Sequence, residues 1–214
     1  MSLRGLSVEY LVTMTTQVPP GTPDDAVAEI RGREAARSRE LAEQGHLLRL
    51  WRPPLGPGEW RTLGLFAADD EARLEEVLAS MPLRVWRTDT VTALSPHPND
   101  PPSPRRSPAR GSDTEFLTTF TVTAPPGVDA QAASELEARE AERARALAEQ
   151  GHLVRLWALP AGPEESRALG LWRARDAAAM EDIVGSLPLT PAGWMSTETT
   201  VLSVHPNDPA IAAA

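Results

Sequence analysis

The chain has 214 residues, of which 41% are hydrophobic and 24% are charged, so it can bury one large or two modest cores. Its net charge of -9 argues against nucleic acid or an anionic membrane as a partner, because both require a basic surface. The absence of cysteine excludes disulfides, thiolate nucleophiles and Cys-ligated metals. No apolar run approaches the roughly 20 residues that span a bilayer, and the N-terminus lacks a secretory pattern, so we expect a cytoplasmic protein.

The first half of the chain alternates between strand-like and helix-like patterns. In chain order we expect a strand over 10–17, a helix over 24–44, strands over 46–52 and 59–66, a helix over 69–80 and a strand over 85–94. Gly45 follows the first helix directly and is predicted to end it in the left-handed conformation. The order β-α-β-β-α-β is ferredoxin-like, with both helices on one face of a four-stranded antiparallel sheet.

The same pattern then occurs a second time. Residues 43–47, with the sequence EQGHL, return as residues 149–153, and the offset of 106 aligns the flanking elements as well. After a short insertion near Pro191, the motif His-Pro-Asn-Asp at 97–100 aligns with the same motif at 205–208. The chain is therefore predicted to be a tandem duplication.

The duplication predicts the domain organisation and the fold class. We expect module 1 over 7–100, a Pro/Arg/Ser-rich linker over 101–112 and module 2 over 113–209. A four-stranded sheet covered on one side leaves its other face apolar, and fusing two copies makes pairing through that face intramolecular. The predicted fold is α+β, with two ferredoxin-like modules that pair as an intramolecular dimeric α+β barrel.

Charged residues interrupt the apolar face of the first helix. Glu34 and Arg37 lie at helical spacing with Val27, Ile30 and Leu41. Copy two repeats the pair as Glu140 and Arg143. One interpretation is a structural Glu-Arg pair, because a buried charge is costly unless it is paired. The other is that both glutamates face a pocket, where partial burial raises a carboxylate pKa towards proton transfer.

All four histidines belong to repeated motifs. His46 and His152 follow the glycine that ends the helix, and we interpret them as structural caps. His97 and His205 precede proline in a loop that either closes over a pocket or only shapes a turn. We expect no metal, because no His/Asp/Glu spacing supplies three or four convergent ligands.

The second strand of each copy supplies a further candidate site. Alternation places Leu47, Arg49 and Trp51 on one face of the strand, and copy two repeats this with Arg155 and Trp157. An Arg beside a Trp suits a substrate carboxylate next to a flat ring. A strand-edge Arg whose stem packs on the Trp is the structural alternative. The sequence does not decide between them.

Each copy resembles the muconolactone Δ-isomerase family along nearly its whole length. The resemblance rests on residues 10–14, Glu34, Gly45 with residues 50–52, Met81-Pro82-Leu83 and His97-Pro98. It implies a ferredoxin-like α+β barrel, higher oligomers, no cofactor, and migration of a lactone ring double bond in bacterial aromatic catabolism.

What the resemblance implies suits the candidate residues. Glu34 and Glu140 would be the catalytic carboxylates, which remove and return a proton. The substrate-binding candidates are Arg37, Arg49, Trp51, Arg143, Arg155, Trp157, His97 and His205. Copy two has Ala158 and Ser166 in place of Arg52 and Trp60, so we expect that one site has drifted or lost activity. The partners expected are a small-molecule substrate and further copies of the chain, with no nucleic acid and no membrane.

Two other functions remain open. One is an enzyme of secondary metabolism that rearranges or cyclises a larger apolar intermediate, which the tryptophan-rich composition would suit. The other is a non-catalytic protein for small-molecule binding or assembly, in which the charged pairs are structural. An open pocket beside Glu34 favours catalysis, and a filled core there opposes it.

Overall fold

A computed structural model describes residues 7–102, 113–162 and 165–212 of the chain. Residues 103–112 of the expected linker, which spans 101–112, therefore lie outside the described residues. The elements of the first copy are β1 (Val8–Thr16), α1 (Asp24–Glu43), β2 (Leu47–Arg52), β3 (Arg61–Ala68), α2 (Glu71–Ala79), a 3-10 helix η1 (Pro82–Trp86) and β4 (Arg87–Pro96). The last strand begins two residues later than predicted, because Pro82 starts the 3-10 turn that contains Val85 and Trp86.

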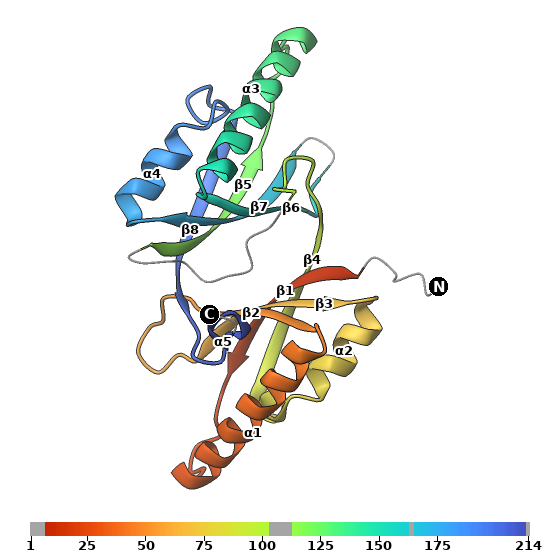
Figure 1. The fold of residues 1–214 in the computed structure, drawn as a ribbon, viewed down its shortest axis with the longest axis vertical. Coiled ribbons are helices and arrows are strands. Elements are labelled where there is room, and N and C mark those ends of the chain that lie inside the picture. Colours follow the sequence, from red (N-terminus) through yellow and green to blue (C-terminus); the bar gives the residue numbers. More distant parts are fainter. Residues whose placement is uncertain (1–6, 103–112, 163–164, 213–214) are drawn as a thin grey trace. The chain divides into compact units, whose positions relative to one another are not determined.

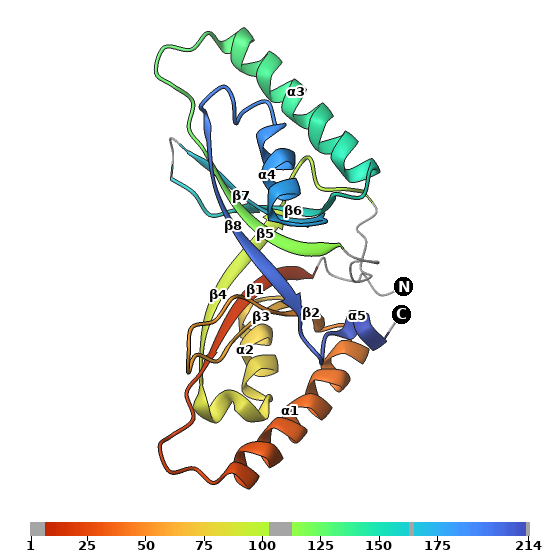
Figure 2. The same cartoon turned by 90° about the vertical axis from the view of Figure 1, so that its left-hand side faces the viewer.

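The second copy repeats this order. Its elements are β5 (Thr114–Val122), α3 (Ala130–Glu149), β6 (Leu153–Leu159), β7 (Ser166–Ala174), α4 (Ala177–Gly185), β8 (Met195–Val204) and a short α5 (Pro209–Ala212). In each copy the first strand lies between the third and the fourth, with antiparallel register throughout. The helices α1 and α2 cover one face of their sheet, and α3 and α4 do the same in theirs (Figure 1, Figure 2). The predicted ferredoxin-like order is confirmed.

Each copy has its own hydrophobic core between its helices and its sheet. In the first copy Leu41 of α1, Leu78 of α2 and Phe66 of β3 are fully buried there. In the second copy Leu147, Val184 and Trp172 take the corresponding places. Burying such side chains contributes about 1.5–3 kcal/mol each, so this interface holds helices and sheet together.

The end of α1 matches the prediction made from Gly45. This glycine has a φ of 79°, and the next residue, His46, donates its backbone N–H to Leu41 O at 2.8 Å. The His46 ring does not bind the helix carbonyls, as a capping side chain would. Its Nδ1 lies 3.0 Å from Ala67 O on β3. His46 therefore has a structural role that links the helix end to the sheet, and His152 does the same at Arg173 O.

The two copies exchange the segments that follow their last strands. Of the described residues, 7–94 and 203–212 form one compact unit, unit 1, whereas 95–102, 113–162 and 165–202 form unit 2. The end of β8 pairs with β2 in unit 1, through Trp51 with Val204 and Arg52 with Ser203. The end of β4 pairs in the same way with β6 in unit 2. Each unit is therefore completed by a segment of the other copy.

These pairings complete the strand order of the fold. Hydrogen-bonded neighbours follow the order β1-β3-β2-β8-β5-β7-β6-β4 and close on themselves. This confirms the predicted fold class, an α+β fold in which two ferredoxin-like modules form an intramolecular dimeric α+β barrel.

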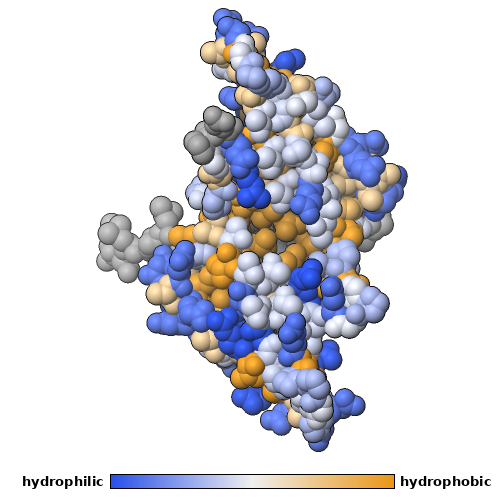
Figure 3. All heavy atoms as spheres, turned by 180° about the vertical axis from the view of Figure 1, so that it is seen from behind, coloured by the Kyte–Doolittle hydropathy of each residue, from blue (hydrophilic) through white to orange (hydrophobic). Residues whose placement is uncertain are grey.

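The described surface is mainly polar. In the view of Figure 3, polar residues (blue to white) cover much of each unit. Among the described residues, the exposed large hydrophobic ones are Leu55, Val85, Val91, Val201 and Ile211. None of the described helices is both long enough and apolar enough to cross a membrane.

Candidate functional site

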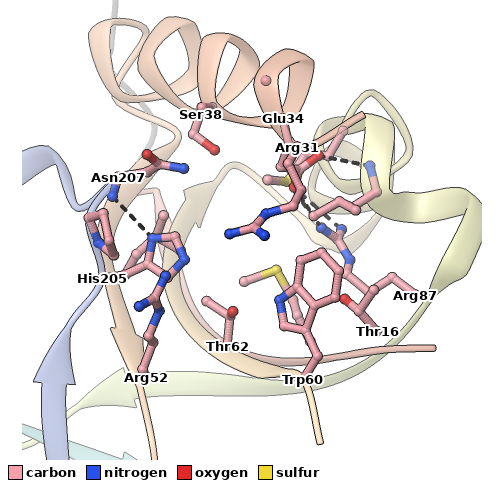
Figure 4. Close-up of a pocket in the computed structure, with 17 residues that line it drawn as sticks. Thr16, Arg31, Glu34, Ser38, Arg52, Trp60, Thr62, Arg87, His205 and Asn207 are labelled. Atoms are coloured by element: carbon pink, nitrogen blue, oxygen red, sulfur yellow. Dashed lines mark hydrogen bonds and ion pairs between the residues drawn. The ribbon is translucent and has the colours of Figure 1, made fainter. Parts of the chain in front are cut away.

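Unit 1 contains a cavity of about 290 Å³ between α1, the helix-covered face of its sheet and the exchanged segment. This volume exceeds the cavity of about 150 Å³ that holds a benzene molecule, so a substituted ring fits. The side chains drawn in Figure 4 come from or directly precede β1, α1, β2, β3, η1, β4 and the exchanged segment. The polar and aromatic ones are Thr16, Arg31, Glu34, Ser38, Arg52, Trp60, Thr62, Arg87, His205 and Asn207.

Glu34 is the carboxylate of this cavity, and it is held by two bonds. Its Oε2 accepts the backbone N–H of Leu83 at 2.8 Å, and its Oε1 lies 3.2 Å from Nη1 of Arg87. Leu83 lies in η1, so the 3-10 turn after α2 supplies the backbone donor. Both contacts orient the carboxylate, whose side chain is only 10% exposed.

Burial raises the pKa of Glu34 above its ordinary value. The N–H of Leu83 and the charge of Arg87 both lower this pKa, and the nearby Asp89 raises it. Arg87 itself is paired with Asp89, with Nε 2.7 Å from Oδ1. Because Arg87 shares its charge with a second carboxylate, it offsets the effect of burial on Glu34 only in part, and the pKa of Glu34 stays above its ordinary value.

Two further arginines give the cavity a positive charge. Arg31 lies on α1 one turn before Glu34, and its guanidinium is 5.4 Å from the ring centroid of Trp60. Arg52 ends β2. Both are solvent-exposed, and no carboxylate among the described residues forms an ion pair with either. In Figure 4 the Arg31 guanidinium points into the cavity between Trp60 and His205. Such a pair of cations suits an anionic ligand.

His205 comes to this cavity on the exchanged segment of copy two. Its Nδ1 accepts the backbone N–H of Asn207 at 3.1 Å, which leaves the ring proton on Nε2. Burial, together with the charges of Arg52 and Arg31, lowers the pKa of His205 to about 4. His205 is therefore neutral near pH 7 and acts there as a hydrogen-bonding group, not as a cation.

The exchanged segment is fastened by a buried ion pair. Asp208 Oδ2 lies 3.0 Å from Arg49 Nε, and the two side chains are 0% and 4% exposed. The Arg49 guanidinium also lies 4.8 Å from the ring centroid of Trp51. In unit 2 Asp100 binds Arg155 at 3.3 Å, with both side chains partly exposed, and Arg155 lies over Trp157. These contacts hold His205 and His97 in place.

These contacts correct the prediction for the second strands. Arg49 and Trp51 do not line the cavity beside Glu34, and neither Arg155 nor Trp157 lines the one beside Glu140. Strict alternation fails because the register with β3 shifts between Leu47 and Arg49, so Leu47 packs in the helix-side core with Leu50. The Arg and Trp side chains lie on the opposite face of the sheet.

The prediction for Arg37 and Arg143 also needs correction. Arg37 does not line the cavity, because it binds Ser80 Oγ at 2.9 Å and Glu40 at 2.8 Å along the edge of the helix layer. Arg143 makes the same contact with Ser186. The buried face of α1 runs through Glu34, Ser38 and Leu41, so it keeps the predicted Glu34 and Leu41 and has Ser38 in place of Arg37.

Unit 2 holds a smaller cavity, of about 80 Å³, at the corresponding place. Glu140 lines it and accepts the backbone N–H of Leu189 at 3.0 Å, and burial raises its pKa. His97 and Asn99 reach it from the segment exchanged by copy one. The predicted residues Glu140 and His97 therefore share one cavity, as Glu34 and His205 share the other.

The main charged residues of the unit 1 cavity were not among those predicted. Arg31, Arg52 and Arg87 come from α1, β2 and β4, so only the folded chain brings them together. A comparison of the copies gives a signal for them, because copy two has Glu137, Ala158 and Met195 at these positions. The described residues contain no group of three His, Asp or Glu side chains placed to hold a metal ion.

The fold and the cavities define the class of protein, a fused dimeric α+β barrel with a cavity in each half. Solved structures show the same fold over the whole chain. A heme-binding protein from Thermus thermophilus is 15% identical, with a TM-score of 0.59 and coverage of 97% of this chain and 95% of its own. Chlorite dismutase from Candidatus Nitrospira defluvii is 13% identical, with a TM-score of 0.55 and coverage of 91% of both chains.

Sequence comparison identifies the family. The model of muconolactone delta-isomerase matches residues 8–100 and again 114–208. Muconolactone Delta-isomerase 1 of Acinetobacter lwoffii is 31% identical over 90 residues, which are 42% of this chain and 91% of the relative. The enzyme of Acinetobacter baylyi is 29% identical with the same coverage. The chain belongs to the muconolactone Δ-isomerase family and contains two copies of its module.

Proposed function

We propose that unit 1 is the active site of an isomerase that moves a double bond in a small unsaturated lactone carrying a carboxylate, as muconolactone does. One observation carries the proposal. Glu34, a carboxylate with a raised pKa, shares a cavity with Arg31 and Arg52, which have no carboxylate partner among the described residues. A proton-transfer group and an anion site in one ring-sized cavity match this substrate class.

The reaction follows from the placement of these groups. Ionised Glu34 takes a proton from the ring carbon at the far end of the conjugated system, and the electrons move into a dienolate. The protonated Glu34 then returns the proton to the carbon next to the lactone carbonyl, so the double bond has moved and no atom is gained or lost. Arg31 and Arg52 bind the substrate carboxylate, and the neutral His205 ring donates its Nε2–H within the cavity.

The surroundings of Glu34 support this role. Leu83 and Arg87 fix both carboxylate oxygens, which reduces the reorganisation needed to present one of them to the substrate. The same proton must leave and return, so a pKa raised by burial is an advantage. The open cavity beside Glu34 favours catalysis over the non-catalytic alternative, which expects a filled core there.

The test is turnover of muconolactone, followed by ultraviolet absorbance, in the wild type, Glu34→Gln and Glu140→Gln. Glutamine keeps the size of the side chain and removes the base, and circular dichroism checks folding. We expect Glu34→Gln to lower kcat by about 10³-fold, in the range of general-base catalysis. The matched Glu140→Gln change should leave kcat within about twofold. Turnover that survives Glu34→Gln, or a wild type that does not turn muconolactone over, would refute the proposal.

A further inference from the structure

The cavity of unit 2 differs from that of unit 1 in both size and charge, with a volume of about 80 Å³ against about 290 Å³. At the positions of Arg31, Arg52 and Arg87 copy two has Glu137, Ala158 and Met195, of which Met195 lines the cavity. Nine of its twelve lining residues are apolar: Phe120, Val122, Ala144, Leu156, Ala168, Trp172, Leu187, Leu189 and Met195. The remaining three are His97, Asn99 and Glu140. A carboxylate ligand would meet no cationic partner in this lining.

Burial shifts the pKa of both titratable groups of this cavity towards the neutral form. Burial raises the pKa of Glu140, and no ion pair on it is found in the described part of the chain. Burial also lowers the pKa of His97, against a smaller opposite effect of Asp100. Because Glu140 Oε2 accepts the N–H of Leu189, a proton on this carboxyl belongs to Oε1. Protonated Glu140 is then a hydrogen-bond donor.

The unit 2 cavity has a second hydrogen-bond donor, at a position where unit 1 has none. Trp172, which is 1% exposed, lines the cavity at the position of Phe66 in unit 1. Its Nε1–H has no hydrogen-bond partner among the described residues. The indole lies over Gly170, where an added Cβ would be 2.2 Å from Nε1, so only glycine leaves room for it. Buried N–H groups are rarely left unpaired, and a ligand oxygen would satisfy this one.

We propose that unit 2 is a separate binding site for a small uncharged ligand, mostly apolar and carrying a carbonyl-type oxygen, such as a lactone without a carboxylate side arm. Trp172 donates to the oxygen, Glu140 donates a second hydrogen bond when it is protonated, and the nine apolar side chains contact the rest of the ligand. The chain thus carries two sites of different ligand class on one duplicated fold. This proposal does not depend on turnover in unit 1.

The two cavities carry separate reporters, because Trp60 lines the first and Trp172 lines the second. The experiment follows both indole N–H resonances of the intact protein by NMR, assigned with Trp60→Phe and Trp172→Phe. The probes are unsubstituted butenolide, which is uncharged, and muconolactone, which carries a carboxylate. We expect butenolide to shift the Trp172 resonance saturably, and muconolactone to shift Trp60 at concentrations that leave Trp172 unchanged.

Matched variants link each response to its cavity. Ala144→Leu fills the unit 2 cavity, and Ser38→Leu makes the same change at the equivalent position of unit 1. Ala144→Leu should weaken the Trp172 response to butenolide at least tenfold, and Ser38→Leu should leave it unchanged. Ala168→Leu and Thr62→Leu form a second matched pair on the strands, for use if the helix variants do not fold.

Three results would overturn the proposal. One is the absence of a saturable Trp172 shift with butenolide. Another is a muconolactone response at Trp172 with the same midpoint as at Trp60, because it would mean that unit 2 accepts the charged ligand. The third is a butenolide response that survives filling of the cavity in a folded variant. Muconolactone turnover in the same samples reports on unit 1 separately, so failure of one proposal is distinguishable from failure of the other.

Discussion

Units 1 and 2 place a glutamate at the same position of their first helix, and each glutamate accepts a backbone N–H from the turn after the second helix. In unit 1 Arg87 lies 3.2 Å from that carboxylate and two more arginines line the cavity. In unit 2 the position of Arg87 is Met195. The comparison shows that the duplicated backbone keeps a carboxylate at the same position in both units. A few side chains on other elements determine the charge of the cavity around that carboxylate.

Of the changes that test the difference between the two units, replacing Arg31 and Arg52 of the unit 1 cavity should have the largest effect. We expect Arg31→Ala with Arg52→Ala to lower kcat/KM for muconolactone by about 10²-fold or more, because each hydrogen bond to a charged group contributes about 1.5–3 kcal/mol. The loss should appear mainly in KM and shrink at high salt. Glu137→Ala, at the unit 2 position of Arg31, is the control and should change nothing. An unchanged KM in the double variant would contradict the anion site.

The segments that complete the two cavities should differ in how strongly they are held. Asp208→Ala removes the ion pair with the buried Arg49, which should cost about 3 kcal/mol of the free energy of unfolding. Asp100→Ala breaks the partly exposed equivalent pair and should cost less. Urea denaturation of both variants measures this difference. Equal losses would show that burial does not distinguish the two attachments.

The pH dependence of turnover should report the difference between Arg87 and Met195. Glu34 acts as a base only when ionised, so kcat/KM falls as pH drops below its pKa. Arg87 lowers this pKa more than Asp89 raises it, so Arg87→Met with Asp89→Thr should move the acidic limb of the profile to higher pH. Both replacements are the unit 2 residues. A shift to lower pH would contradict the assigned roles.

Replacing His205 is expected to have the smallest effect on turnover. The pKa of His205 is lowered to about 4, so between pH 5 and 8 the ring stays neutral and adds no charge to the anion site. His205→Gln should therefore lower kcat/KM only severalfold and leave the shape of the pH profile unchanged in that range. His97→Gln, in unit 2, serves as the control. Loss of a profile step between pH 6 and 7 on His205→Gln would show that the ring titrates during turnover.

Local patterns predicted the elements well and part of the site. The repeat, the helix end at Gly45 and the shared position of Glu34 and Glu140 follow from spacing along one helix or one motif. The face of a strand or helix on which a given side chain lies was less predictable. The register shift after Leu47 turns Arg49 and Trp51 away from the helices, and the buried face of α1 includes Ser38 instead of Arg37.

Local sequence patterns could not predict the three arginines of the unit 1 cavity, for a different physical reason. Arg31, Arg52 and Arg87 lie on three elements, and only the folded sheet brings them to one cavity. The exchange of segments is also not encoded in any local pattern, although the repeated His-Pro-Asn-Asp motif marks the residues involved. A comparison of the two copies position by position, with charge as the criterion, is the sequence signal that finds these arginines.

The most direct test of the difference between the two units is the stoichiometry of muconolactone binding, measured by calorimetry on the Glu34→Gln chain, which binds without turnover. We expect one site per chain, and its loss when Arg31 and Arg52 are replaced by alanine. Two equivalent sites per chain would show that unit 2 accepts the same anion and would contradict the separation of the two cavities.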